Sequence, residues 1–143
     1  MAGPQFLTPK PVRPSRPRRR FTLLEANSSL PLVKRIVADI VRTHGEAAKL
    51  QQLLERSSAK SQSTTQAALE QAMHRLEDYV DELSEVGCEL KDYQMGLIDF
   101  TGRHQGRDIC LCWKLGEDEI VYWHEMESGF AGRKPVALLK EGE

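Results

Sequence analysis

The sequence predicts an α+β fold: a long antiparallel helical hairpin, preceded by a short helix, packed on a small antiparallel β-sheet. Two observations carry this prediction. Apolar residues recur at three- and four-residue steps between residues 33 and 83, which is typical of helices that pack along one face. After Gly87 the apolar spacing changes to two, which is typical of strands. With 143 residues, 40% of them hydrophobic and 29% charged, the chain has the size and composition of one globular domain.

Residues 1–20 form a segment of different composition. They hold six of the 20 basic residues, none of the 21 acidic ones and five of the seven prolines. With so few apolar groups we expect a disordered basic arm. Such an arm could bind nucleic acid by releasing counterions from phosphates, through Arg16, Arg18, Arg19 and Arg20. The favoured interpretation is a solvated leader, because basic runs are commonly only tails.

Regular structure is predicted to begin directly after the arm. Thr22 and Glu25 have the spacing of a capping box, in which each side chain binds the other residue's backbone amide. Pro31 follows, and proline suits the first turn of a helix better than its interior. The sequence therefore predicts a short helix over about 23–29, a break, and a long helix that starts near Pro31.

Two long helices are predicted to fill the segment 21–87. The first carries a broad apolar stripe, and the second has a heptad-like seam from Leu69 to Leu83. A polar stretch from Ser57 to Gln66 separates them, so we expect the turn of the hairpin near residue 60. Gly87 stands where a glycine commonly ends a helix. A heptad seam serves a hairpin within one chain and a homodimer equally well, so both stay open.

The sheet is predicted within residues 88–135, and residues 136–143 are expected to form a tail. Short strands are expected at 88–90 and 97–100, and a hairpin from strands 108–115 and 119–124. With its turn centred on residues 117–118, this hairpin places Leu111 opposite His124, on an apolar face that packs on the helices. The other face then holds Cys110, Cys112, Trp123 and Glu125.

This register bears directly on metal binding. Cys112 and His124 are residue types that bind zinc, but the predicted register puts them on opposite faces, and the chain has no CxxC pair. No metal site and no cofactor are therefore predicted. A further candidate is the segment Gly129–Pro135, whose glycines flank Arg133 and could form an anion-binding corner. The favoured interpretation is a glycine-rich turn whose arginine pairs with Asp99, Glu125 or Glu127.

The tentative ligand-binding residues are gathered in the C-terminal third of the chain. They are Asp99, Cys110, Cys112, Trp123, His124, Glu125 and Arg133. No serine has the context of a nucleophile elbow, and no spacing singles out an acid–base pair, so no catalytic residue is named. The three cysteines lack a disulfide framework, and neither a leader with an apolar core nor a membrane-spanning apolar run is present. We expect a cytoplasmic protein without membrane contact.

Several ungapped blocks occur in an order that resembles an uncharacterised bacterial family, domain of unknown function 2203. The blocks are Phe21–Asn27, Leu30-Pro31, Glu89–Asp92, Gly96–Phe100, Gly106–Glu117, Trp123–Glu125 and Gly129–Pro135. The resemblance covers roughly residues 21–135. It implies no activity, because the family has none assigned.

Three classes of function stay open from the sequence. A non-enzymatic interaction or scaffold protein with an unidentified protein partner is favoured, because the chain lacks a catalytic constellation. The first alternative is a small anionic ligand or metal site on the C-terminal sheet. The second, less favoured, is nucleic-acid binding through the basic arm.

Overall fold

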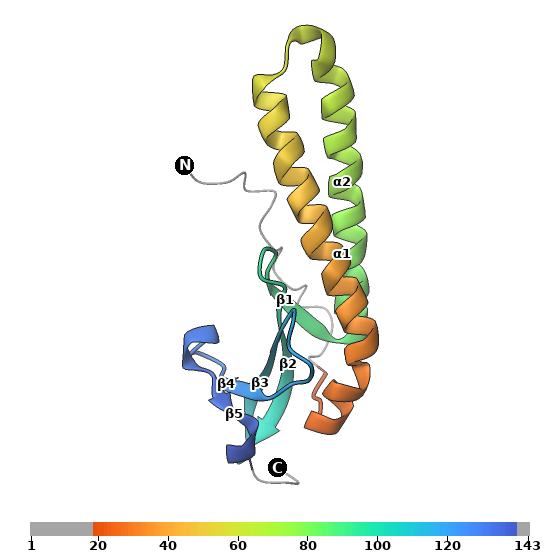
Figure 1. The fold of residues 1–143 in the computed structure, drawn as a ribbon. Helices are drawn as coiled ribbons and strands as arrows, with labels where there is room; N and C mark the ends of the chain where they lie inside the picture. Colours follow the sequence, from red (N-terminus) through yellow and green to blue (C-terminus); the bar gives the residue numbers. More distant parts are fainter. Residues whose placement is uncertain (1–18, 140–143) are drawn as a thin grey trace.

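The structure is a computed structural model that describes residues 19–139. Two long helices, α1 (Leu23–Arg56) and α2 (Ala59–Val86), pack side by side as an antiparallel hairpin. A sheet lies beside the end of this hairpin at which α1 begins and α2 ends (Figure 1). The predicted α+β fold is confirmed. The turn between the helices takes only Ser57 and Ser58, so α2 begins well before the apolar seam that predicted it.

The predicted break before Pro31 is wrong, because α1 runs unbroken from Leu23 through Pro31 to Arg56. The predicted capping box is present: Glu25 N donates to Thr22 Oγ1 at 3.0 Å, and Thr22 N donates to Glu25 Oε1 at 2.8 Å. Proline removes one helical hydrogen bond, the one to the carbonyl four residues earlier. Residues on both sides of Pro31 are fully buried on the same face, and this burial keeps the helix continuous.

The sheet has five antiparallel strands arranged in chain order. They are β1 (Cys88–Asp92), β2 (Leu97–His104), β3 (Arg107–Lys114), β4 (Tyr122–Glu125) and β5 (Lys134–Pro135). Strand β2 is longer than predicted, and β5 was not predicted at all. Two short 3-10 helices, η2 (Phe130–Gly132) and η3 (Val136–Leu138), flank β5.

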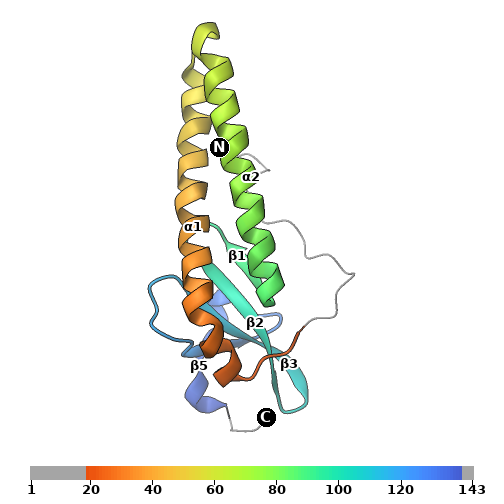
Figure 2. The same ribbon diagram turned by 90° about the vertical axis from the view of Figure 1, so that its right-hand side faces the viewer.

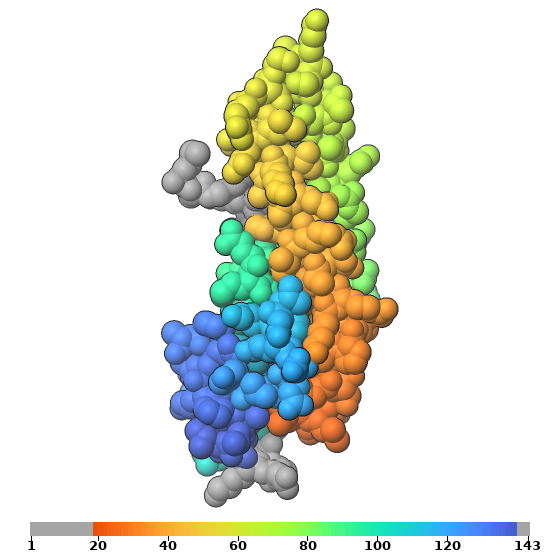
Figure 3. All heavy atoms as spheres, in the orientation of Figure 1, coloured from red at the N-terminus to blue at the C-terminus, as the bar shows by residue number. Residues whose placement is uncertain are grey.

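One face of the sheet packs on the helices and forms the main core. Side chains at alternate positions on β2 and β3 join the buried stripe of α1, with Phe100 and Trp113 fully buried at its centre. A second, smaller cluster of Ala47, Leu69 and Ala72 holds the helices together farther along the hairpin. The tip of the hairpin extends beyond the sheet, as both ribbon views and the space-filling view make plain (Figures 1, 2 and 3).

The junction between α2 and β1 is closed by Gly87 and Phe21. Gly87 has φ +113°, and a Cβ atom there would lie 3.0 Å from the Phe21 ring, so glycine is required for both backbone angle and space. Phe21 is 4% exposed, packs edge-on against Phe100, and its N–H donates to Thr101 O at 2.8 Å. The chain therefore enters the fold beside the sheet before α1 begins. No helix among residues 19–139 is both long enough and apolar enough to cross a membrane.

Candidate metal and ligand site

The observed register of β3 and β4 differs by one residue from the predicted one. Cys110 pairs with His124, Leu111 with Trp123 and Cys112 with Tyr122. Because neighbouring residues on a strand point to opposite faces, a shift of one residue exchanges every side chain of β4 between the two faces. Trp123 therefore lies on the core face, and His124 shares the other face with Cys110 and Cys112. The predicted separation of Cys112 from His124 is wrong.

The segment between β3 and β4 explains this shift. Instead of a tight turn, residues 115–121 form a loop. Backbone groups in and beside this loop form hydrogen bonds with side chains, one of which belongs to α1. Trp113 Nε1 donates to Glu117 O at 2.9 Å, and Glu117 Oε1 accepts from Lys114 N at 2.8 Å. Ile120 N donates to Asn27 Oδ1 of α1 at 2.7 Å. These bonds satisfy backbone groups that a tight hairpin would pair across the strands, so the ladder starts at Tyr122.

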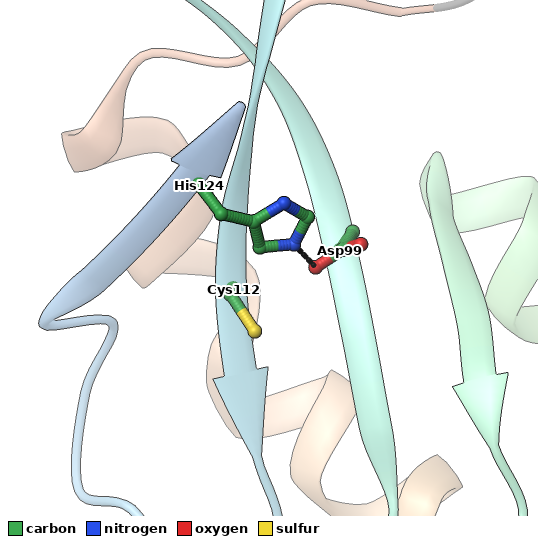
Figure 4. Close-up of side chains that lie close together, drawn as sticks. All are labelled: Asp99, Cys112 and His124. Carbon is green, nitrogen blue, oxygen red and sulfur yellow. Dashed lines mark hydrogen bonds and ion pairs between the residues drawn. The ribbon is translucent and has the colours of Figure 1, made fainter. Parts of the chain in front are cut away.

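Three of the predicted site residues converge on the face away from the helices. Asp99 of β2, Cys112 of β3 and His124 of β4 sit on adjacent strands, and their side chains gather on one side of the sheet (Figure 4). One ligand atom from each lies within 4.8 Å of the others, and all three residues are buried. Asp99 and Cys112 are register partners across β2 and β3, which explains their proximity.

Two hydrogen-bonding contacts fix the imidazole of His124. Its Nδ1 lies 2.7 Å from the backbone O of Glu125, and its Nε2 lies 3.1 Å from Asp99 Oδ1 (Figure 4). A carbonyl oxygen only accepts, so Nδ1 carries a proton and donates it. Nε2 consequently faces the carboxylate either as the second N–H of an imidazolium or as a lone pair. In the second case a cation or a carboxyl proton is needed between Nε2 and the oxygen.

The thiol of Cys112 is strongly affected by its position. Burial, together with the negative charge of Asp99, raises the pKa of Cys112 from 9.0 to about 12. The thiol is therefore protonated at neutral pH, and it is not an activated nucleophile. A bound cation would reverse this preference, because a thiol that coordinates a metal ion is deprotonated.

A cavity of about 250 Å³ adjoins the three-residue cluster on the same face of the sheet. Asp99 and His124 form part of its wall, and Cys110 lies beside them with its Sγ 3.5 Å from Met126 Sδ. The remaining wall residues are Glu89, Lys91, Leu97, Thr101, Gly129 and Phe130. Of these, the sequence pointed only to Gly129 and Phe130, as part of the segment Gly129–Pro135. Pairing of β1 with β2 brings Glu89 opposite Asp99, and only the register reveals this.

Arg133 lies near enough for its charge to act on the Cys112 thiol, and it already has a carboxylate partner. Its guanidinium is 2.5 Å from Glu117 Oε2 and stacks against the rings of Tyr122 and Phe130, with distances of 4.1 and 4.7 Å to their centroids. This arrangement fastens the segment that carries Phe130 over the sheet face. The glycine-flanked corner is thus built around an ion pair, and its arginine is 12% exposed.

The other predicted residues are placed elsewhere. Trp123 is 4% exposed in the core, with Lys134 Nζ 5.0 Å from its ring centroid. Glu125 accepts two hydrogen bonds from Arg107, at 2.9 and 2.6 Å, and these bonds lower the pKa of Glu125. Neither residue reaches the cluster through its side chain.

The basic residues predicted to bind nucleic acid are only partly within the described chain. Arg16 and Arg18 lie outside residues 19–139. Arg19 lies over the Phe21 ring, with 4.2 Å from its guanidinium carbon to the ring centroid. Arg20 Nε donates to Asp108 Oδ1 at 2.8 Å. These two arginines already have partners within the fold.

A second hollow, of about 380 Å³, lies between the two helices toward the hairpin tip. Apolar side chains of Leu54, Leu69 and Met73 line it together with two glutamines, two glutamates and His74. None of the predicted site residues is near it. Its apolar part suits contact with an apolar surface.

Comparison with known proteins identifies one family. Residues 19–136 match the family described as "Uncharacterized conserved protein (DUF2203)". Neither the curated proteins nor the solved structures contain a significant match to the chain.

Proposed function

The chain belongs to the DUF2203 family, and from the geometry of its sheet we propose that it binds one divalent transition-metal ion, with zinc as the best fit. The ligands are Asp99 Oδ1, Cys112 Sγ and His124 Nε2. One observation carries the proposal: these three ligand atoms lie within 4.8 Å of one another on three adjacent strands.

The ligand set matches what zinc prefers. Zinc accepts nitrogen, sulfur and oxygen together, at about 2.0–2.3 Å. Ligand atoms on one tetrahedral ion are then about 3.3–3.6 Å apart. The distance between His124 Nε2 and Asp99 Oδ1 is 3.1 Å, and no distance in the cluster exceeds 4.8 Å. The widest separation that this limit allows needs to shrink by about 1.2–1.5 Å to seat an ion, which divides between two side chains.

The outer contacts of His124 also support the proposal. A metal-bound histidine almost always donates its other ring N–H to a carbonyl or carboxylate, which fixes the ring and its tautomer. Glu125 O provides that acceptor at 2.7 Å from Nδ1. The competing explanation is a buried imidazolium–carboxylate pair that serves only the fold. It accounts for Asp99 and His124, and in it the Cys112 thiol serves only as a hydrogen-bond donor to Asp99.

Metal titration of purified, chelator-treated protein tests the proposal. We expect one equivalent of Zn²⁺ or Co²⁺ to bind, and the Co²⁺ form to show a thiolate charge-transfer band in the near ultraviolet. Cys112→Ser should abolish the band, and Asp99→Asn should weaken binding at least tenfold, about 1.4 kcal/mol. Cys88→Ala is the matched control, since Cys88 is a buried thiol on the core side of the sheet. If Cys112→Ser binds Co²⁺ as tightly as the wild type does, the assignment is wrong.

A second candidate function, protein interaction through the helical hairpin, is supported by the apolar hollow near its tip. Leu54 lines the hollow, whereas its neighbour Leu53 is 53% exposed and lies outside it. If this hollow receives a protein partner, Leu54→Glu should lose a partner that Leu53→Glu retains in a pull-down. Circular dichroism establishes that both variants are folded. Equal retention by the two variants would argue against this surface.

A further inference from the structure

The three-ligand cluster opens into the adjoining cavity, and this placement points to the class of molecule that the site takes. We propose that the metal centre keeps its fourth coordination position open and binds there a small carboxylate with a short apolar body. This inference rests on the metal binding proposed above.

The ligand count supports an open position. Zinc is almost always four-coordinate in closed structural sites, whereas sites that bind substrate or water have three protein ligands. Among residues 19–139, the cluster offers three. Asp99 and His124 also form part of the wall of the 250 Å³ cavity, so an ion held by these two residues borders that space. The cavity is thus the direction from which a fourth ligand approaches.

Cys110 is the protein group that could close the site instead. It lies on the same strand face as Cys112 and is 6% exposed. However, its Sγ contacts Met126 Sδ at 3.5 Å, and it is not part of the group whose ligand atoms lie within 4.8 Å of one another. Residues two apart on a strand are separated by about 6.6 Å along its axis. Cys110 therefore belongs to the cavity wall and not to the coordination sphere.

The cavity wall has two chemically different parts. Leu97, Met126 and Phe130 provide apolar surface for a short hydrocarbon chain. Lys91 provides a cation, which is held by Glu89 with Nζ 2.9 Å from Oε1. A carboxylate that coordinates the metal ion shares the cavity with this cation, so it competes with Glu89 for the ammonium group. The wall chemistry thus favours an anionic head group with an apolar body.

The cavity volume limits the size of the ligand. A space of 250 Å³ corresponds to about eight water molecules at about 30 Å³ each. It is smaller than the roughly 300–1,000 Å³ of pockets that hold drug-sized ligands. The cavity therefore suits a short-chain carboxylate and not a drug-sized ligand.

The test uses the Co²⁺-loaded full chain, with butyrate as the probe and neutral butyramide as the matched control. Binding of butyrate to the metal ion should change the visible d–d absorption saturably, and butyramide should leave it unchanged. Lys91→Met should weaken butyrate binding about three- to tenfold, and Glu89→Gln should strengthen it because the competing carboxylate is gone. Lys60→Met, in the first turn of α2 and remote from the cavity, should have no effect.

The possible failures separate the two proposals. If Co²⁺ binds but butyrate leaves its d–d bands unchanged, the open position is refuted and the metal site stands. If Cys110→Ser reduces the thiolate charge-transfer intensity by about half, Cys110 is the fourth ligand and the site is closed. If Co²⁺ does not bind, both the metal site and this inference are refuted.

Discussion

Raising the pH above 9 should destabilise the metal-free protein through two buried thiols. Burial raises the pKa of Cys88 and of Cys112 from 9.0 to about 12. Between these values the folded chain keeps a proton on each sulfur, whereas the unfolded chain has lost it. The stabilising contribution of each neutral thiol is therefore complete below pH 9, and it is lost as the pH rises from 9 towards 12.

The size of this loss of stability follows from the size of the pKa shift. A displacement of three pKa units at 1.36 kcal/mol per unit is worth about 4 kcal/mol for each thiol, or about 8 kcal/mol for both at pH 12. Halfway through the window, near pH 10.5, the combined loss is about 4 kcal/mol. A typical domain has about 5–15 kcal/mol of stability in total, so the effect is large enough to measure well before the protein unfolds.

Urea unfolding at pH 8, 9.5 and 10.5, with reductant and chelator present, measures the free energy of unfolding directly. In Cys88→Ala and in Cys112→Ala, the decrease between pH 8 and 10.5 should be about 2 kcal/mol smaller than in the wild type. Each variant starts from its own lower stability, so only the pH-dependent difference is compared. A wild-type stability that stays constant up to pH 10.5, or variants with the same slope as the wild type, would refute this reasoning.

Three further predictions concern stability at neutral pH. Thr22→Ala removes the capping box of α1 and should lower the free energy of unfolding by about 1 kcal/mol, measured in urea. Pro31→Ala restores an N–H for the Asn27 carbonyl inside α1 and should raise the free energy of unfolding by up to about 3 kcal/mol; a decrease would contradict this account of the helix. Glu117→Gln leaves the guanidinium of Arg133 without its carboxylate and should cost about 3 kcal/mol, with a lower thermal midpoint by circular dichroism. An unchanged midpoint would mean that this pair does not hold the segment.

The helical hairpin could be predicted from sequence because its cause is local. A stripe with period 3.6 that buries Val33, Val37 and Ile40 specifies a helix whatever lies around it. Proline and capping signals are equally local, but they compete with burial, and the stripe continues across Pro31. The helix therefore continues through Pro31, because the burial of its apolar stripe outweighs the local cost of the proline.

The strand register depends on contacts that sequence patterns do not contain. The loop before β4 is held by Asn27, more than ninety residues away along the chain. A hydrogen bond of this kind leaves no periodic signal. The apolar alternation of β4 also misleads, because Tyr122 and Trp123 are both aromatic and either could face the core.

The site illustrates the same limit. Asp99, Cys112 and His124 were each recognised as candidates from residue type. Their convergence depends on the register of β3 and β4, and the predicted register differed from the observed one by one residue. Their approach requires the register of both strand pairs: Asp99 lies opposite Cys112, and His124 lies opposite Cys110, diagonally from Cys112. Lys91 and Met126 of the cavity wall lie on other segments, and nothing in their spacing marks them.

The buried apolar side chains of the hairpin form two clusters, and this division determines which end of the hairpin opens more readily. The sheet end shares the main core, whereas the tip end depends chiefly on Ala47, Leu69 and Ala72. This cluster, even with the partly buried Leu50, Leu54 and Met73 packed against it, is smaller than the main core, so the tip end of the hairpin should open locally more readily than the sheet end. A molecule that engages the tip meets a segment that can still order on contact, while the strands that hold Asp99, Cys112 and His124 stay fixed.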